Sequence, residues 1–86
     1  MPNPRLYHVL LLNDDETPME FVVRVLERLF DMDYDDACAH MLRIHNEGKA
    51  ICGIYGLEDA KKKVADILAL AREHKHPLQS AIEEAD

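Results

Sequence analysis

The 86-residue chain is short of basic residues, cysteines and long apolar runs, and each shortage excludes a class of protein. Ten Lys and Arg stand against 17 Asp and Glu, so the net charge is −7 with His neutral, which disfavours nucleic acid as a partner. The apolar run from Leu6 to Leu12 is far too short to span a bilayer, so we expect no membrane partner. No secretory signal pattern precedes that run.

The two cysteines, Cys38 and Cys52, are not spaced as a Cys-x-x-Cys pair. Each lies in an apolar pattern, which is typical of a buried thiol in a reducing compartment. We therefore expect two free thiols, no disulfide and a cytoplasmic location.

The length corresponds to a single domain over residues 1–86, near the small end for independent folding. Apolar residues make up 48% of the chain, which allows a modest core. The sequence contains no repeats, no linker and no low-complexity tract.

Hydrophobic periodicity predicts strands and helices in the order β-α-α-β-α-β. The run Leu6–Leu12 is predicted to be a strand buried on both sides and central in its sheet. A helix opens at Thr17-Pro18, where Thr17 fits the N-cap, Pro18 fits the first helical position and Glu20 completes a capping box.

Further along, Asp33 is predicted to cap a second helix that stops at Gly48. Residues Ala50 to Tyr55 then predict a second strand, in which Gly53 marks a bulge or a point of close approach. A third helix from Leu57 to about Glu73 precedes a short third strand, in which Leu78, Ser80 and Ile82 alternate.

These elements predict an α+β fold, with helices covering one face of a small three-stranded antiparallel sheet. Residues 1–5 are expected to form a short N-terminal arm, and residues 84–86 a frayed tail.

Polar side chains follow the first strand: Asn13, Asp14 and Asp15 lie between it and the first helix. Met41, Ile44 and His45 form a patch on the second helix, because they are spaced i, i+3, i+4. If this patch faces the loop, Asn13, Asp15 and His45 converge over an apolar floor. A pocket with a few convergent polar groups above an apolar wall suits a small amphipathic ligand. The floor would consist of Met19, Val22, Met41 and Ile44.

The same residues leave two other interpretations open. Asp14, Asp15 and His45 could form a metal-binding or hydrolytic site, although the chain has no nucleophile elbow, no HExxH and no phosphate loop. The second interpretation is a plain protein-interaction domain, since the same order of elements occurs in the C-terminal domain of a ribosomal-stalk protein.

Four motifs, in this order and over nearly the whole chain, resemble the ClpS family, the adaptors that recognise N-degrons for the ClpAP protease. Because the members of this family are adaptors, the resemblance implies no enzyme activity, no catalytic residue, no cofactor and no metal. The motifs are Asn13-Asp14-Asp15-x-Thr17-Pro18-Met19-Glu20-Phe21, Met41-Leu42-x-Ile44-His45, Gly48-Lys49-Ala50-Ile51-Cys52-Gly53 and His76-Pro77-Leu78.

The resemblance also implies roles for individual residues. Asn13 and His45 would hold the free α-amino group of a substrate, and Asp15 would act on it through water or long-range charge. On electrostatic grounds the nearby carboxylates of Asp14 and Asp15 also favour the positive charge of that group. Met19 would be the gate that excludes β-branched first residues, while Leu, Phe, Tyr and Trp are accepted. The pocket for the first side chain would be lined by Leu12, Thr17, Pro18, Met19, Val22, Met41, Ile44 and Leu78.

The implied partners are N-degron proteins with a hydrophobic first residue and the N-terminal domain of a ClpA-type AAA+ unfoldase. Glu58 and Lys63 match positions that dock the protease in this family. Two departures from the family pattern stand out: Ile44 replaces a common Val, and Gly56 replaces a Thr helix cap. The arm at residues 1–5 is shorter than in many relatives, so we expect either that the chain was trimmed or that the protein binds substrates better than it delivers them.

Overall fold

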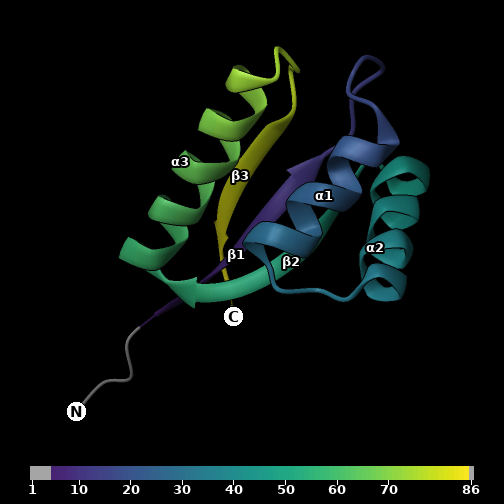
Figure 1. Cartoon of the computed structure of the whole chain (residues 1–86). Coiled ribbons are helices and arrows are strands. Elements are labelled where there is room, and N and C mark those ends of the chain that lie inside the picture. The colour runs from purple at the N-terminus through teal and green to yellow at the C-terminus, as the bar shows by residue number, and fades with distance from the viewer. Residues whose placement is uncertain (1–4, 86) are drawn as a thin grey trace.

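A three-stranded antiparallel sheet packs against three helices in the computed structural model, which describes residues 5–85 (Figure 1). The predicted α+β order β-α-α-β-α-β is confirmed. Residues 1–4 of the predicted arm and Asp86 of the predicted tail lie outside the described residues. The elements are β1 (Leu6–Leu12), α1 (Met19–Leu29), α2 (Tyr34–Glu47), β2 (Lys49–Gly56), α3 (Leu57–Glu73) and β3 (Gln79–Glu84).

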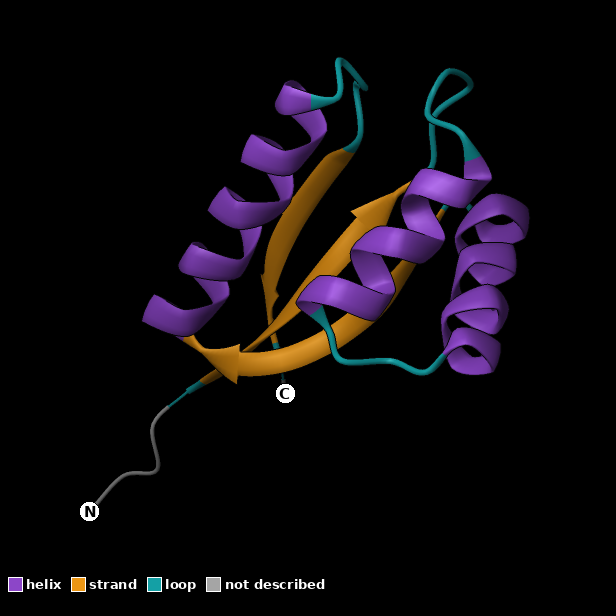
Figure 2. Ribbon diagram, in the orientation of Figure 1, coloured by secondary structure: helices purple, strands orange, loops and turns teal. Residues whose placement is uncertain are grey.

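β1 is the central strand of the order β2-β1-β3, as predicted. All three helices lie on one side of the sheet (Figure 2), where Val9 and Leu11 of β1 are fully buried. The prediction that β1 is buried on both sides along its length is wrong, because Leu6 is 47% exposed. Leu10 points to the uncovered face but is still buried, in a hollow that long side chains such as Arg43 line.

A β-bulge in β2 occurs where Gly53 predicted it. Val9 pairs with Gly53 and Leu10 with Ile51, so Cys52 is the extra residue. Gly53 is also a point of close approach, since a Cβ added there would lie 2.6 Å from the Tyr55 ring.

The predicted ends of α2 are confirmed. The Asp36 N–H donates to the Asp33 side chain at 2.8 Å, which caps the start of the helix. Gly48 ends it in a left-handed conformation with φ of 90°, and its N–H donates to the Ile44 carbonyl at 2.9 Å.

The predicted capping box of α1 is wrong. The N-cap is Pro18, whose carbonyl accepts hydrogen bonds from the N–H groups of Phe21 and Val22 at 3.0 and 3.3 Å. The Thr17 hydroxyl donates to Asp14 at 2.7 Å instead of accepting from the helix. The loop before α1 therefore competes successfully for the side chain that would otherwise cap it.

The predicted tail at residues 84–86 is also wrong where the chain is described. Glu84 belongs to β3 and pairs with Tyr7, and the Ala85 N–H donates to the Leu6 carbonyl at 2.9 Å. Arg5, directly before β1, forms an ion pair with Glu84 of β3. Pairing with the central strand thus orders Glu84 and Ala85. Among residues 5–85, no helix has the length and apolar character needed to cross a membrane.

Candidate functional site

The loop after β1 lies beside the last turn of α2 because of the sheet register. Leu12 pairs with Lys49, the first residue of β2, so the next residue, Asn13, reaches the end of α2. There the Asn13 N–H donates to the Gly48 carbonyl at 2.8 Å. His45 lies in the last turn of this helix. The fold therefore brings together two parts of the predicted site that are far apart in sequence.

Asp14 holds the loop in shape. Its carboxylate accepts from the N–H of Glu16 at 2.9 Å, and from the N–H and the hydroxyl of Thr17 at 2.7 Å each. Partial burial raises the pKa of Asp14, but these hydrogen bonds and the nearby His76 outweigh it, so the pKa lies below its ordinary value. Because its oxygens serve the loop, Asp14 acts on any ligand mainly through its charge.

A cavity of about 180 Å³ opens between this loop, α1 and α2. Every residue that lines it belongs to the predicted site. Its floor is apolar, since Val22 and Ile44 are buried and Met41 is half-buried, while Met19 stands 45% exposed at its edge. The lining residues are Asn13, Asp14, Asp15, Thr17, Met19, Val22, Met41, Ile44 and His45.

The mouth of the cavity is polar. Asn13, Asp15 and His45 are all exposed there. Within residues 5–85, none of these three side chains is engaged by a hydrogen bond to another protein group. An amide oxygen, a carboxylate and an imidazole nitrogen are therefore free to accept hydrogen bonds from a ligand.

Three residues predicted for the pocket lie elsewhere. Leu78 is 2% exposed in the core, directly before β3. Pro18 lines a different hollow, together with Phe21 and His76. Leu12 is half-buried at the end of β1 and is not among the described residues that line the cavity.

The residues predicted for protease docking lie on α3, and their surroundings differ. Glu58 is exposed in the first turn of the helix. Lys63 is half-buried, and its ammonium donates a hydrogen bond to the Leu29 carbonyl. The same ammonium lies 5.6 Å from the ring centroid of Phe30 and 5.5 Å from that of Tyr55.

The metal-binding interpretation finds no support in the geometry. Across residues 5–85, no three His, Cys, Asp or Glu side chains come together in a way that could hold a metal ion. Asp14, Asp15 and His45 share a cavity but do not form a ligand set.

Sequence reasoning missed a second hollow beside the first. It lies between α1 and α2, has a volume of about 300 Å³ and shares Met19 and Met41 with the predicted cavity. Helical spacing offered a signal for it: Val23 and Glu27 are four apart on α1, as are Tyr34 and Cys38 on α2. The other lining residues are Glu20 and Arg24.

Comparison with known proteins gives one consistent result. Residues 2–81 match the family described as "ATP-dependent Clp protease adaptor protein ClpS". The chain is 54% identical over 83 residues to the adapter protein ClpS of Hyphomonas neptunium, covering 96% of this chain and 70% of that protein. It is 51% identical over 82 residues to the adapter protein ClpS of Vibrio cholerae, covering 95% and 77%.

Among solved structures, the chain is similar to Agrobacterium tumefaciens ClpS2 bound to L-phenylalaninamide. The TM-score is 0.93 and the sequence identity 36%, and the match covers 96% of this chain and all of the other. The two proteins are therefore similar in sequence as well as in fold.

Proposed function

Because the chain belongs to the ClpS family of adaptors for the ATP-dependent Clp protease, we propose that its cavity receives the first residue of a substrate protein. The free α-amino group would lie at the polar mouth, and a bulky hydrophobic side chain (Leu, Phe, Tyr or Trp) would enter the apolar interior. The observation that carries this proposal is the placement of Asn13 and His45 over the floor made by Val22 and Ile44.

The chemistry of the mouth suits an α-amino group. With a pKa near 8, this group arrives mostly charged, and its N–H donors need acceptors. The Asn13 side-chain oxygen and an unprotonated His45 nitrogen would supply them, while Asp14 and Asp15 favour the positive charge. The ligand named with ClpS2, L-phenylalaninamide, has a free α-amine and an aromatic side chain, which are the two groups that this cavity would read.

Burial of the first side chain and hydrogen bonding of the α-amino group would together give specificity, because each alone is weak. Burying a Leu or Phe side chain contributes roughly 1.5–3 kcal/mol. Leaving these acceptors unpaired once a bound chain covers the mouth costs about 1–3 kcal/mol. Internal Leu and Phe residues would therefore be rejected, because they lack the amine.

The test is fluorescence anisotropy with a Phe- or Leu-initiated peptide, free and N-acetylated. Acetylation removes the charge and two donors, so affinity should fall by roughly a hundredfold. Equal affinity for the two forms would overturn the proposal. Asn13→Ala should weaken binding of the free peptide, whereas Asn46→Ala, which removes an exposed amide outside the cavity, should not.

Delivery to the protease would use a surface away from the cavity, at the start of α3, by contact with the N-terminal domain of a ClpA-type AAA+ unfoldase. Glu58 is the better placed of the two proposed docking residues, because it is exposed and Lys63 is engaged within the protein. Glu58→Lys should weaken association with that domain while peptide affinity stays unchanged. Glu73→Lys, at the far end of α3, is the control, and equal effects of the two would refute docking through Glu58.

A further inference from the structure

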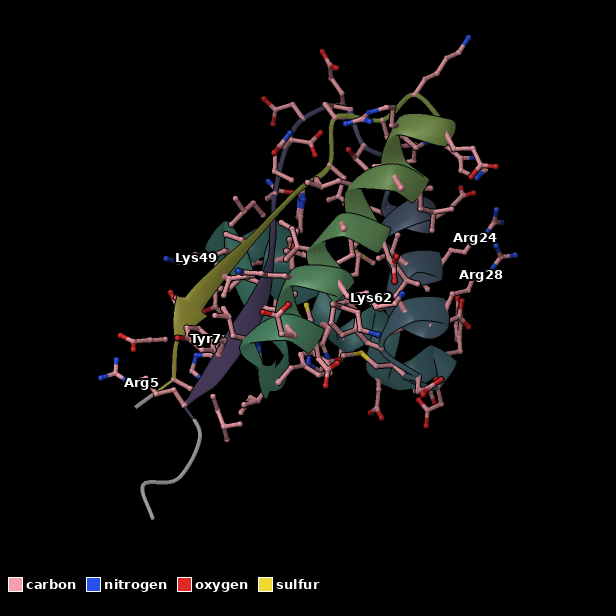
Figure 3. The ribbon with its side chains drawn as sticks, turned by 90° about the vertical axis from the view of Figure 1, so that its left-hand side faces the viewer. Arg5, Tyr7, Arg24, Arg28, Lys49 and Lys62 are labelled. Atoms are coloured by element: carbon pink, nitrogen blue, oxygen red, sulfur yellow. The ribbon has the colours of Figure 1, made fainter. Side chains whose placement is uncertain are left out.

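The second hollow, called here the α1–α2 groove, has the make-up of a peptide site. Its floor is apolar, with Val23 buried and Cys38 and Met41 half-buried. Its rim carries donors and acceptors suited to a peptide backbone. The rim residues are Glu20, Arg24, Glu27 and Tyr34, and Arg24 projects outward from α1 (Figure 3).

The groove continues the first cavity. Met19 and Met41 line both hollows, so within residues 5–85 this pair of flexible thioether side chains forms the wall that the two hollows share. At about 180 Å³, the first cavity is smaller than the 300–1,000 Å³ typical of small-molecule pockets, which suits one side chain and not a peptide. The rest of a substrate must therefore leave across the rim.

The length of the groove fits a short extended segment. From Met41 through Cys38 to Tyr34 the helix advances two turns, a distance of about 10 Å. Three extended residues span about 10 Å as well. A chain that crosses Met19 and Met41 would thus lie along the whole floor of the groove before reaching Tyr34.

We propose that the α1–α2 groove binds the second to fourth residues of the same substrate whose first residue occupies the cavity. This proposal rests on the function proposed above. One of these side chains packs over Val23 and Cys38, and the rim pairs with the peptide backbone. The groove therefore adds selectivity for sequence downstream of the first residue.

Cys38 gives a direct test, because its free thiol lies within the groove. The other thiol, Cys52, is buried outside the groove, and burial raises its pKa to about 11, so it reacts slowly in the folded protein. The rate at which N-ethylmaleimide modifies Cys38 is measured by mass spectrometry with no ligand, with saturating L-phenylalaninamide and with saturating Phe-initiated tetrapeptide amide. Binding of each ligand is confirmed separately by calorimetry.

The tetrapeptide should slow Cys38 modification several-fold, whereas L-phenylalaninamide, which fills the first cavity alone, should leave the rate nearly unchanged. Equal rates with the two bound ligands would overturn the groove proposal and leave the proposed function intact. Failure of both ligands to bind would instead overturn the proposed function, and the groove proposal with it.

A variant provides a second, independent readout. Tyr34 is 66% exposed, so Tyr34→Ala should fold normally. Tetrapeptide affinity should fall about fivefold, while affinity for L-phenylalaninamide stays the same. Leu42→Ala, on the same helix and 49% exposed outside both hollows, is the control and should change neither affinity. Equal losses for both ligands, or no loss for the tetrapeptide, would count against the groove.

Discussion

Asp14 fixes the shape of the loop, whereas its neighbours Asn13 and Asp15 are available to contact a ligand. Asp14 accepts three hydrogen bonds from Glu16 and Thr17, whereas Asn13 and Asp15 stay exposed at the cavity mouth. Because Asp14 is only half-buried, water weakens these bonds, and each contributes little. Together they still fix where α1 begins and hence where Met19 stands.

Replacing Asp14 with Ala should lower the free energy of unfolding by about 1 kcal/mol at neutral pH. The pKa of Asp14 is lowered on folding, so its contribution is complete above its unfolded value of about 3.9 and is lost as pH falls through the folded pKa. Urea unfolding of wild type and variant should show the same difference in stability at pH 7 and pH 5, and a smaller difference at pH 3. A difference that persists unchanged at pH 3, or that Asp15→Ala reproduces, would contradict this role.

Met19 is the residue on which discrimination among first side chains should depend. It stands at the edge of the cavity, 45% exposed, where it would meet the second branch of an Ile or Val side chain. Met19→Ala should raise affinity for Ile- and Val-initiated peptides by roughly tenfold or more, while Leu-initiated peptides change much less. Anisotropy with the matched peptides measures the preference, and an unchanged preference would place the gate elsewhere.

At the scale of elements, local signals predicted most of the fold. The cap at Asp33, the stop at Gly48 and the bulge at Gly53 each depend on neighbouring residues and were correct. The start of α1 failed, because Asp14 competes for the Thr17 hydroxyl. The tail failed for a different reason: Glu84 is ordered by pairing with Tyr7, a partner that no local pattern reveals.

For the candidate site too, local patterns were predicted correctly and contacts between distant segments were not visible in the sequence. Spacing placed Met41, Ile44 and His45 on one face, but only the pairing of Leu12 with Lys49 brings that face to Asn13. Leu78 was assigned to the pocket by resemblance, and in the structure it is buried in the core. Helical and turn chemistry is therefore readable in a single sequence, whereas distances between elements depend on packing that the sequence encodes only indirectly.

Gly53 tests how the bulge in β2 is packed. A methyl group there would lie 2.6 Å from the Tyr55 ring, so Gly53→Ala should displace that ring and lower the free energy of unfolding by about 1–3 kcal/mol. The matched control is Gly56→Ala, where an added Cβ meets nothing within 4 Å and φ is an ordinary −64°. Its effect should stay within about 0.5 kcal/mol. Urea unfolding of both variants decides, and equal stabilities would contradict the close approach.

At the scale of the whole molecule, Lys63 joins parts that the chain order separates. From α3 its ammonium donates to Leu29 at the end of α1 and lies over the rings of Phe30 and of Tyr55 in β2. A cation at a helix C-terminus is also favoured by the helix dipole. The residue that the family resemblance assigned to docking therefore also holds α1, β2 and α3 together.

Lys63→Met should lower the free energy of unfolding by about 1–3 kcal/mol, because a charge-assisted hydrogen bond and cation–π contacts are both lost. The control is Lys62→Met, which removes an exposed ion pair to Asp66 at 3.0 Å and should change stability by about 0.5 kcal/mol. Urea unfolding at fixed pH compares the two variants, and equal effects on stability would refute the structural role.

If Lys63→Met also weakens unfoldase binding, the variant Lys63→Arg separates loss of stability from loss of a direct contact. Loss of binding in a stable Lys63→Arg protein would indicate direct docking by the lysine, whereas recovery of both stability and binding would show that a cation at this position is sufficient for both.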